Sequence, residues 1–302
     1  MWMNRSGMDV VVQAPAKLNL FFEVLGKRDD GYHEVETLMC PISLFDTLVV
    51  TEQPSGPIEF SCRSDSGISG PRPDWLDEVP EGPENLVVRA VELLRQRAGI
   101  NRGLRVRLTK RIPTAAGMGG GSSDAAAALA AACDAWNLGY SRSDLARLGA
   151  ELGSDVPFFL ENSPAVCRGR GEQSEPIAGL GTLHFAVVRP PEGLSTAAVY
   201  RACRSATEPR GVGPLVAALR CGDLAAIGRL LFNRLESAAA RLSPWIDRLR
   251  RVFAGMDVVG HGMSGSGTSY FGLCRHARHA LRVARQLQAG GAGSVFAVQS
   301  CG

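Results

Sequence analysis

The chain has 302 residues, of which 45% are hydrophobic and 21% are charged, so it can bury the core of one large domain or two smaller ones. A formal net charge of +3 excludes the strongly basic composition of many nucleic-acid-binding and membrane-surface proteins. The longest apolar run, residues 125–133, is far shorter than the ~20 residues that cross a bilayer.

The cysteines and the first residues indicate the compartment. The eight cysteines include no CxxC pair and the chain has no HExxH motif, so a structural zinc site is not expected. Residues 1–10 contain no secretory apolar stretch. We therefore expect a cytoplasmic protein with reduced thiols and no membrane partner. The sequence does not indicate an oligomeric state.

The first half of the chain is predicted to mix strands and helices. Alternating or continuous apolar runs predict strands at residues 10–13, 18–25, 47–52, 58–62 and 104–108. Periodic apolar patterns and capping signals predict helices at residues 85–99, 122–136 and 141–152. Residues 26–31 read as a turn, and residues 64–83, rich in Ser, Gly, Pro and Asp, as a surface excursion.

The second half continues this mixture. Strands are expected at residues 166–168, 184–188, 269–274 and 294–298. Helices are expected at residues 196–204, 213–220, 224–242 and 245–254, with an Arg-rich helix that ends at residue 287. Because strands and helices do not alternate regularly, the predicted fold class is α+β, with a soft boundary between residues 155 and 180.

A glycine-rich segment, residues 113–124, precedes an alanine-rich helix. Its glycines allow close approach of the backbone to a ligand, and the free N–H groups there and at the helix start suit a phosphate. The alternative is a flexible loop whose serines merely cap the helix. The segment is no P-loop, because no Lys follows the last glycine, and no Rossmann fingerprint, because Ser122 occupies the third glycine position.

Two further segments carry candidate catalytic groups. Lys17 and Asn19 are two residues apart, so on a strand they share one face; the alternative is a lysine that reaches solvent at a strand edge. Asp155 precedes Val-Pro-Phe-Phe at the start of a short helix, where it could equally be a structural N-cap. Only three of the 33 basic residues are lysines. A coding bias toward arginine explains most of this, but a retained lysine can also mark a need for a compact ammonium.

Residues 15–20, 113–125 and 264–268 resemble the three motifs of the GHMP kinase superfamily. Residues 27–33 and 154–159, with residues 169–172 and 233–236, look like the branch that phosphorylates a cytidine-diphosphate-linked methylerythritol. The similarity runs from about residue 12 to residue 298. Residues 61–83 look longer than this family requires.

The resemblance implies a two-lobed α+β fold with the active site in the cleft between the lobes. The N-terminal ATP-binding lobe would span residues 1–165 and the C-terminal lobe residues 166–302. The implied reaction uses ATP as co-substrate, with Mg²⁺, and phosphorylates the 2-hydroxyl of 4-diphosphocytidyl-2-C-methyl-D-erythritol on the non-mevalonate route to isoprenoid precursors.

The resemblance also implies roles for single residues. Asp155 would be the general base and Lys17 its electrostatic partner. The substrate side would be lined by Asn19, Tyr32, His33, Thr196 and Tyr200. The ATP site would comprise Asn85, Leu86 and Lys110 near the adenine, and Pro113, Gly117, Gly119, Gly120, Gly121, Ser122 and Ser123 at the triphosphate. The third motif contributes Gly265, Ser266 and Gly267. No metal ligand is assigned.

Three alternatives stay open at this point. The chain could be a GHMP kinase for another small alcohol, such as mevalonate or homoserine, but the Gly-Tyr-His segment favours a pyrimidine. It could be a nucleotide-binding regulator without turnover, which the presence of both Lys17 and Asp155 argues against. Finally, a basic helix face could bind nucleic acid, although its spacing suits a solvated surface equally well and no nucleic-acid partner is expected. This face carries Arg275, Arg278, Arg282 and Arg285.

Overall fold

In a computed structural model that describes residues 1–64 and 79–301, the chain divides into two units. Unit 1 comprises Met1–Ala16, Leu44–Thr114 and Gly119–Asn162, and unit 2 comprises Lys17–Ser43, Ala115–Met118 and Ser163–Gly302. Of the predicted surface excursion at residues 64–83, residues 65–78 lie outside the described part. The two functional lobes expected on either side of residue 165 stay a prediction.

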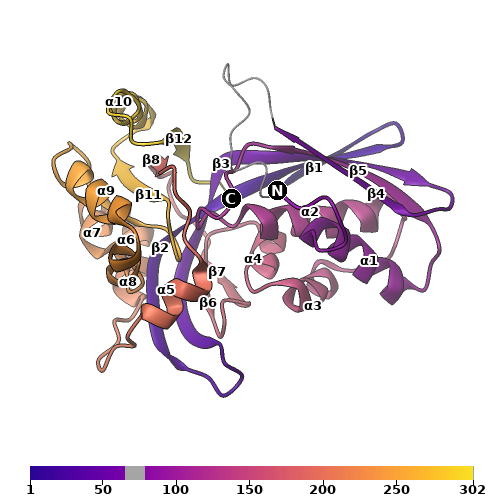
Figure 1. Cartoon of the computed structure of the whole chain (residues 1–302), viewed down its shortest axis with the longest axis horizontal. Coiled ribbons are helices and arrows are strands. Elements are labelled where there is room, and N and C mark those ends of the chain that lie inside the picture. Colours follow the sequence, from indigo (N-terminus) through magenta and orange to yellow (C-terminus); the bar gives the residue numbers. More distant parts are fainter. Residues whose placement is uncertain (65–78, 302) are drawn as a thin grey trace. The chain divides into compact units, whose positions relative to one another are not determined.

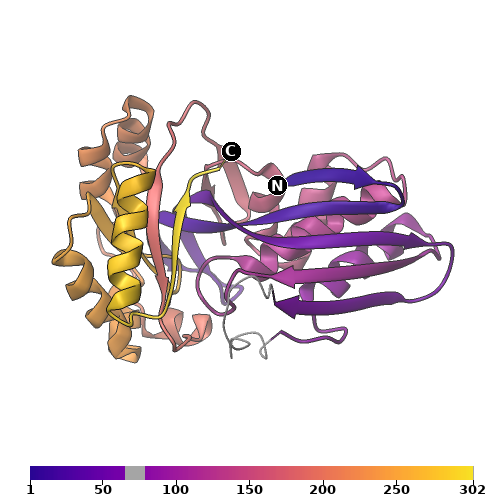
Figure 2. The ribbon, with the colours of Figure 1, turned by 90° about the horizontal axis from the view of Figure 1, so that it is seen from above.

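Unit 1 contains a mixed sheet in the order β1-β2-β3-β5-β4 (Figure 2). Its neighbours are antiparallel where β1 meets β2 and β3 meets β5, whereas β4 and β5 run parallel. In β5, apolar residues 104, 106 and 108 are buried and alternate with exposed arginines, which confirms the predicted half-buried strand. The strands are β1 (Trp2–Ser6), β2 (Asp9–Lys27), β3 (His33–Gln53), β4 (Ile58–Ser64) and β5 (Gly103–Lys110).

Four helices gather on one face of this sheet (Figure 1). They are α1 (Leu86–Ala98), α2 (Gly120–Ala135), α3 (Arg142–Leu152) and α4 (Val156–Glu161). The alanines of α2 are almost all buried, because short side chains let the helix pack closely against both α1 and α4. The predicted capping box of α3 is present, with Ser141 and Asp144 each bonded to the other's backbone.

Unit 2 holds the continuations of β2 and β3 and a separate antiparallel sheet in the order β10-β11-β8-β12. Helix α10 packs over β8 and β12 (Figure 2), and the core also includes side chains of α8 and α9. The strands are β6 (Ala165–Arg168), β7 (Gln173–Pro176), β8 (His184–Arg189), β9 (Phe232–Asn233), β10 (Gly260–Met263), β11 (Tyr270–Cys274) and β12 (Ser294–Gln299). The helices are α5 (Thr196–Ala202), α6 (Gly213–Cys221), α7 (Leu224–Leu230), α8 (Glu236–Leu242), α9 (Pro244–Ala254) and α10 (Ala277–Ala289).

The mixed sheets and helices confirm the predicted α+β class, but three element predictions were wrong. The strands at residues 10–13 and 18–25 are one strand, β2, which continues through Pro15. Strand β3 begins at His33, whereas the predicted strand began at residue 47. The earlier part was not predicted, because residues 38–42 are buried on both faces and their sequence therefore shows no alternation of apolar and polar residues. The helix predicted over residues 224–242 is interrupted by β9, which pairs in parallel with β2. No helix in the described part of the chain is long and apolar enough to span a membrane.

Candidate active site

The glycine-rich segment has an unusual backbone. Ala115, Gly117 and Gly119 all have positive φ, at 49°, 71° and 70°. Left-handed residues alternating with ordinary ones are the backbone pattern from which anion-binding nests are built. Glycine adopts this conformation without strain, whereas for Ala115 it costs about 1 kcal/mol.

In unit 1, the start of α2 lacks a side-chain cap. The N-cap residue is Gly119, and no side chain of the described residues caps the helix. The first intrahelical bond runs from the N–H of Ser123 to the carbonyl of Gly119, so the preceding N–H groups have no partner within the helix. The alternative in which the serines merely cap the helix is therefore wrong. The Ser123 hydroxyl is buried without a hydrogen-bond partner among the residues described.

Several predicted ATP-site residues lie around this helix start. A Cβ built on Gly120 would lie 3.3 Å from Lys110 Nζ, and one on Gly121 would lie 3.7 Å from Leu86 Cδ1. A Cβ on Gly153 would lie 3.9 Å from Ser122 Oγ. The start of α2 thus contacts the end of β5, the start of α1 and the turn that leads to Asp155.

Asp155 occupies the N-cap position of α4, which packs against α2 (Figure 1). Its backbone is helical, with φ −85° and ψ −11°, and among the described residues its side chain makes no capping hydrogen bond to α4. The structural N-cap interpretation is therefore wrong, because the half-buried carboxylate does not cap α4.

Two residues predicted near the adenine have local partners instead of open positions. Asn85 caps α1, since its Oδ1 accepts from the Val87 N–H at 2.8 Å while its Nδ2 donates to the Pro80 carbonyl at 2.6 Å. Lys110 is buried and donates to two carboxylates, those of Asp46 and Asp124. Their contact with ATP stays a prediction.

In unit 2, Lys17 is held by a chain of buried hydrogen bonds. Lys17 Nζ donates to Asn19 Oδ1 at 2.5 Å, Asn19 Nδ2 donates to Thr37 Oγ1 at 2.8 Å, and Thr37 Oγ1 donates to the Phe21 carbonyl at 2.7 Å. Lys17 is only 4% exposed, so the interpretation as a strand-edge lysine in solvent is wrong. Thr37 was not predicted as a site residue, because its only signal in the sequence is a hydroxyl within an apolar run.

The third motif packs against the first two within unit 2. Ser264 Oγ accepts from the Asn19 N–H at 3.1 Å and donates to the Gly117 carbonyl at 3.0 Å. Asn233 Nδ2 donates to the carbonyls of Met263 and Gly265, both at 2.8 Å. Neither Ser264 nor Asn233 was predicted as a site residue, although both lie in segments that resemble the family.

The backbone at Gly117 packs closely against the third motif, and a substitution there tests this packing. A Cβ at Gly117 would lie 2.3 Å from the Ser264 carbonyl oxygen, in addition to the left-handed φ. We expect Gly117→Ala to lower the free energy of unfolding by clearly more than the ~1–2 kcal/mol that a left-handed alanine alone costs. Denaturant unfolding measures this, with Gly222→Ala as control, because Gly222 has φ +67° but open space around it. Equal losses in the two variants would contradict the close packing.

Predicted substrate-side and third-motif residues form two pairs in unit 2. The rings of His33 and Tyr200 lie 4.9 Å apart, and Thr196 Oγ1 lies 2.8 Å from Ser266 Oγ. Burial and the Lys27 ammonium lower the pKa of His33, which favours a neutral imidazole. Tyr32 is 54% exposed, and the guanidinium of Arg170, which lies in a segment that resembles the family but had no predicted role, is 4.9 Å from its ring centre.

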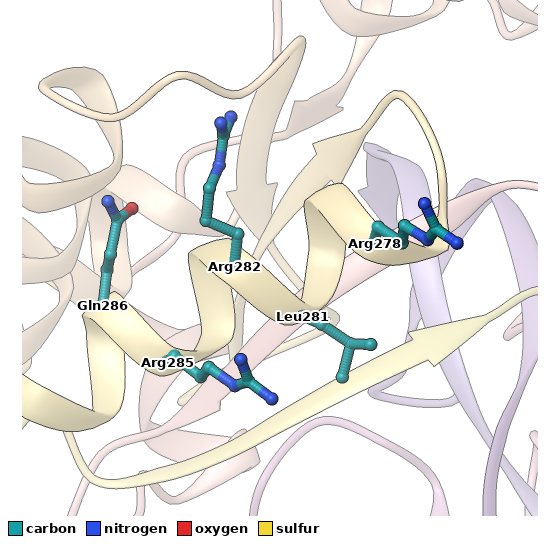
Figure 3. A pocket seen from close by; sticks show the side chains of 5 residues that line it. All are labelled: Arg278, Leu281, Arg282, Arg285 and Gln286. Carbon is teal, nitrogen blue, oxygen red and sulfur yellow. The ribbon is translucent and has the colours of Figure 1, made fainter.

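An open surface pocket of about 440 Å³ lies on the outer face of α10, and none of the predicted site residues lines it. Figure 3 shows its lining side chains on this one helix, pointing in different directions. They are Arg278, Leu281, Arg282, Arg285 and Gln286. Asp257 forms ion pairs with both Arg275 and Arg282, which reduces the charge of this face. That nucleic acid is no partner stays a prediction.

Comparison with known proteins identifies the family. The model of the GHMP kinases N terminal domain matches residues 85–162, and that of the GHMP kinases C terminal matches residues 215–293. A 4-diphosphocytidyl-2-C-methyl-D-erythritol kinase of Pelotomaculum thermopropionicum is 41% identical over 279 residues, which cover 92% of this chain and 93% of that protein. The chain belongs to the 4-diphosphocytidyl-2-C-methyl-D-erythritol kinase family.

Other members of the 4-diphosphocytidyl-2-C-methyl-D-erythritol kinase family agree. One from Shouchella clausii is 39% identical, covering 97% of this chain and 94% of that protein. A crystal structure of 4-(cytidine 5'-diphospho)-2C-methyl-D-erythritol kinase has a TM-score of 0.80 at 37% identity and covers 97% of this chain and 99% of that one. A homoserine kinase from Cytophaga hutchinsonii has a TM-score of 0.74 at 18% identity, covering 99% of this chain and 96% of that one, and therefore shares the fold.

Proposed function

We propose that the chain transfers the γ-phosphate of ATP to the 2-hydroxyl of 4-diphosphocytidyl-2-C-methyl-D-erythritol, a step toward isoprenoid precursors. The observation that carries this proposal is the 41% identity, over 92% of the chain, with a kinase named for that substrate. A homoserine kinase and a mevalonate kinase of similar fold are 18% and 16% identical, so they support the fold alone.

The triphosphate would bind the glycine-rich segment and the start of α2. The uncapped helix start offers N–H groups and the positive end of the helix dipole, both of which favour an anion. The left-handed glycines support this assignment, since a backbone without Cβ atoms admits a phosphate closely. Asn85, Leu86 and Lys110 would flank the adenine, and Pro113 would begin the loop.

The chemistry asks for a base and a positive charge. Phosphoryl transfer depends mainly on positioning and charge stabilisation, and a tertiary alcohol gives up its proton only as transfer proceeds. We assign to Asp155 the role of accepting the proton of the substrate hydroxyl, since its carboxylate does not cap α4. Lys17 would offset charge on the transferring group, and its compact ammonium, fixed by Asn19, suits this better than a planar guanidinium.

Magnesium would enter with the nucleotide. Mg²⁺ prefers oxygen ligands, keeps several waters and is usually held by one or two protein groups together with phosphates. The buried hydroxyl of Ser123, which has no partner in the described chain, fits this need, and the cation would offset charge on the phosphate oxygens. No group of three or more His, Cys, Asp or Glu side chains in the described chain could hold a metal ion by itself.

The substrate's cytosine would bind beside His33 and Tyr200. The centres of these rings lie 4.9 Å apart with their planes tilted by 35°. Stacking on an aromatic ring contributes about 1–3 kcal/mol per base. Tyr32 would cover the base from its exposed position, and Asn19 and Thr196 would line the alcohol side. The third motif, with Gly265, Ser266 and Gly267, would close the site around Lys17.

Binding of CDP tests the substrate class. Saturating CDP is expected to raise Tm, because a native-state ligand at 100 times its Kd adds about 2.7 kcal/mol to the free energy of unfolding. Thermal unfolding with CDP, mevalonate or homoserine measures this. His33→Ala should reduce the CDP shift, whereas His184→Ala, on β8, serves as a control and should keep it.

ATP consumption with the three alcohols, compared side by side, tests the reaction itself. We expect turnover with the cytidine-linked methylerythritol alone. Turnover with mevalonate or homoserine, together with no CDP shift, would replace this assignment by another GHMP kinase activity.

A further inference from the structure

Unit 1 contains a buried cluster of three charges, of which only Lys110 has a place in the proposed ATP site. Lys110 Nζ lies 2.5 Å from Asp46 Oδ2 and 2.7 Å from Asp124 Oδ2, and each of the three side chains is no more than 3% exposed. The residues come from three elements: β3, the end of β5 and α2. We call this group the Lys110 cluster.

The Lys110 cluster ties the end of β5 to the start of α2. Asp46 Oδ1 accepts the N–H groups of Arg111 at 2.5 Å and Ile112 at 2.9 Å, so it fixes the chain just before the glycine-rich segment. Asp124 lies one turn into α2, after the uncapped residues that we assign to phosphate binding. Lys110 forms ion pairs with both carboxylates. It also lies next to Gly120, because a Cβ built on Gly120 would be 3.3 Å from Lys110 Nζ.

Stability alone does not account for such a cluster. Buried ion pairs can often be replaced by apolar residues without loss of stability, because the desolvation of the charges cancels the attraction. With both carboxylates ionised, the cluster would carry a formal charge of −1, and burial, partly countered by Lys110, raises the pKa of Asp124 above its usual range. Asp124 Oδ1 has no hydrogen-bond partner in the described part of the chain. What the cluster does provide is a defined position for α2.

We propose that Asp124, through its hydrogen bond to Lys110, is a positioning residue that fixes the first turns of α2 and thereby sets the affinity for the phosphates of ATP. This inference rests on the proposed function, because it assumes that ATP binds at this helix start.

Asp124→Ala tests the proposal, because it removes the hydrogen bond between Lys110 and α2. Lys110 and Asp46 then remain as an ion pair without net charge. We expect the Kd for ATP, measured by calorimetry without the second substrate, to rise about tenfold, and amides of residues 123–127 to exchange hydrogen faster. Asp124→Asn keeps an acceptor for Lys110 and is expected to restore most of the affinity. Asp134→Ala, which removes an exposed ion pair with Arg5 at the other end of α2, is the matched control and should change neither quantity.

The proposal is overturned if Asp124→Ala binds ATP like the wild type with unchanged exchange, or if Asp124→Asn weakens binding as much as Asp124→Ala. Asp124→Leu, which fills the vacated volume, is measured in parallel and decides the same question if the alanine variant does not fold. If the wild type itself binds no ATP, the proposed function fails, and hydrogen exchange alone then decides for or against the positioning role.

Discussion

Asp155→Asn is expected to lower kcat by a factor of about 10²–10⁴, the usual contribution of a general base. The amide keeps the size of the side chain but cannot take the proton of the substrate hydroxyl. Because Asp155 makes no capping bond to α4 among the described residues, the substitution should leave this helix intact. Steady-state kinetics with ATP and the cytidine-linked substrate measures kcat, and calorimetry should show an unchanged Kd for ATP.

Asp223→Asn is the matched control for this experiment. Asp223 also occupies an N-cap position, at α7, but its Oδ1 accepts the Ala226 N–H, and asparagine caps equally well. We expect wild-type kinetics from this variant. An Asp155→Asn enzyme with wild-type turnover would remove the general-base role and leave a group that only orients the hydroxyl.

Lys17→Met is expected to lower kcat by a factor of about 10²–10³, as for the loss of one preorganised electrostatic contact in other active sites. Methionine retains the length of the side chain and its packing but removes the ammonium that Asn19 holds. Thr37→Val should give a smaller loss in kcat, since the ammonium remains and only its support through Asn19 is weakened. Steady-state kinetics separates these effects on kcat from effects on KM.

Lys27→Met is the control for the loss of a lysine charge, because Lys27 is exposed. Its kcat should stay within twofold of the wild type, roughly the scatter of a surface substitution. If Lys17→Met also retained wild-type kcat, Lys17 would be a structural residue of the β2 core rather than part of the chemistry.

Where local signals dominate, the sequence predicted the fold well. The alternation in β5, the helical pattern of α1 and the capping box of α3 are all set by residues within a few positions of one another. Prediction failed where distant partners decide. Strand β9 exists because it pairs with β2, some 211 positions earlier in the chain, and nothing local interrupts the helical pattern there.

The same limit applies to the candidate site. The glycine-rich segment and Lys17 could be found from spacing and residue type, because their chemistry is visible locally. Thr37 and Asp46 could not, since each acts through a partner on another element: Asn19, 18 positions from Thr37, and Lys110, 64 positions from Asp46. Polar residues inside apolar strands were the only hint.

The burial of two of the three lysines has a practical consequence. All three lie in the described chain; Lys17 and Lys110 are 4% and 3% exposed, and Lys27 alone among them is exposed. Among the lysines, an amine-directed fluorophore or cross-linker therefore attaches at Lys27 alone, at the loop end of β2, while the protein is folded. Acylation of the other two would then serve as a direct reporter of unfolding.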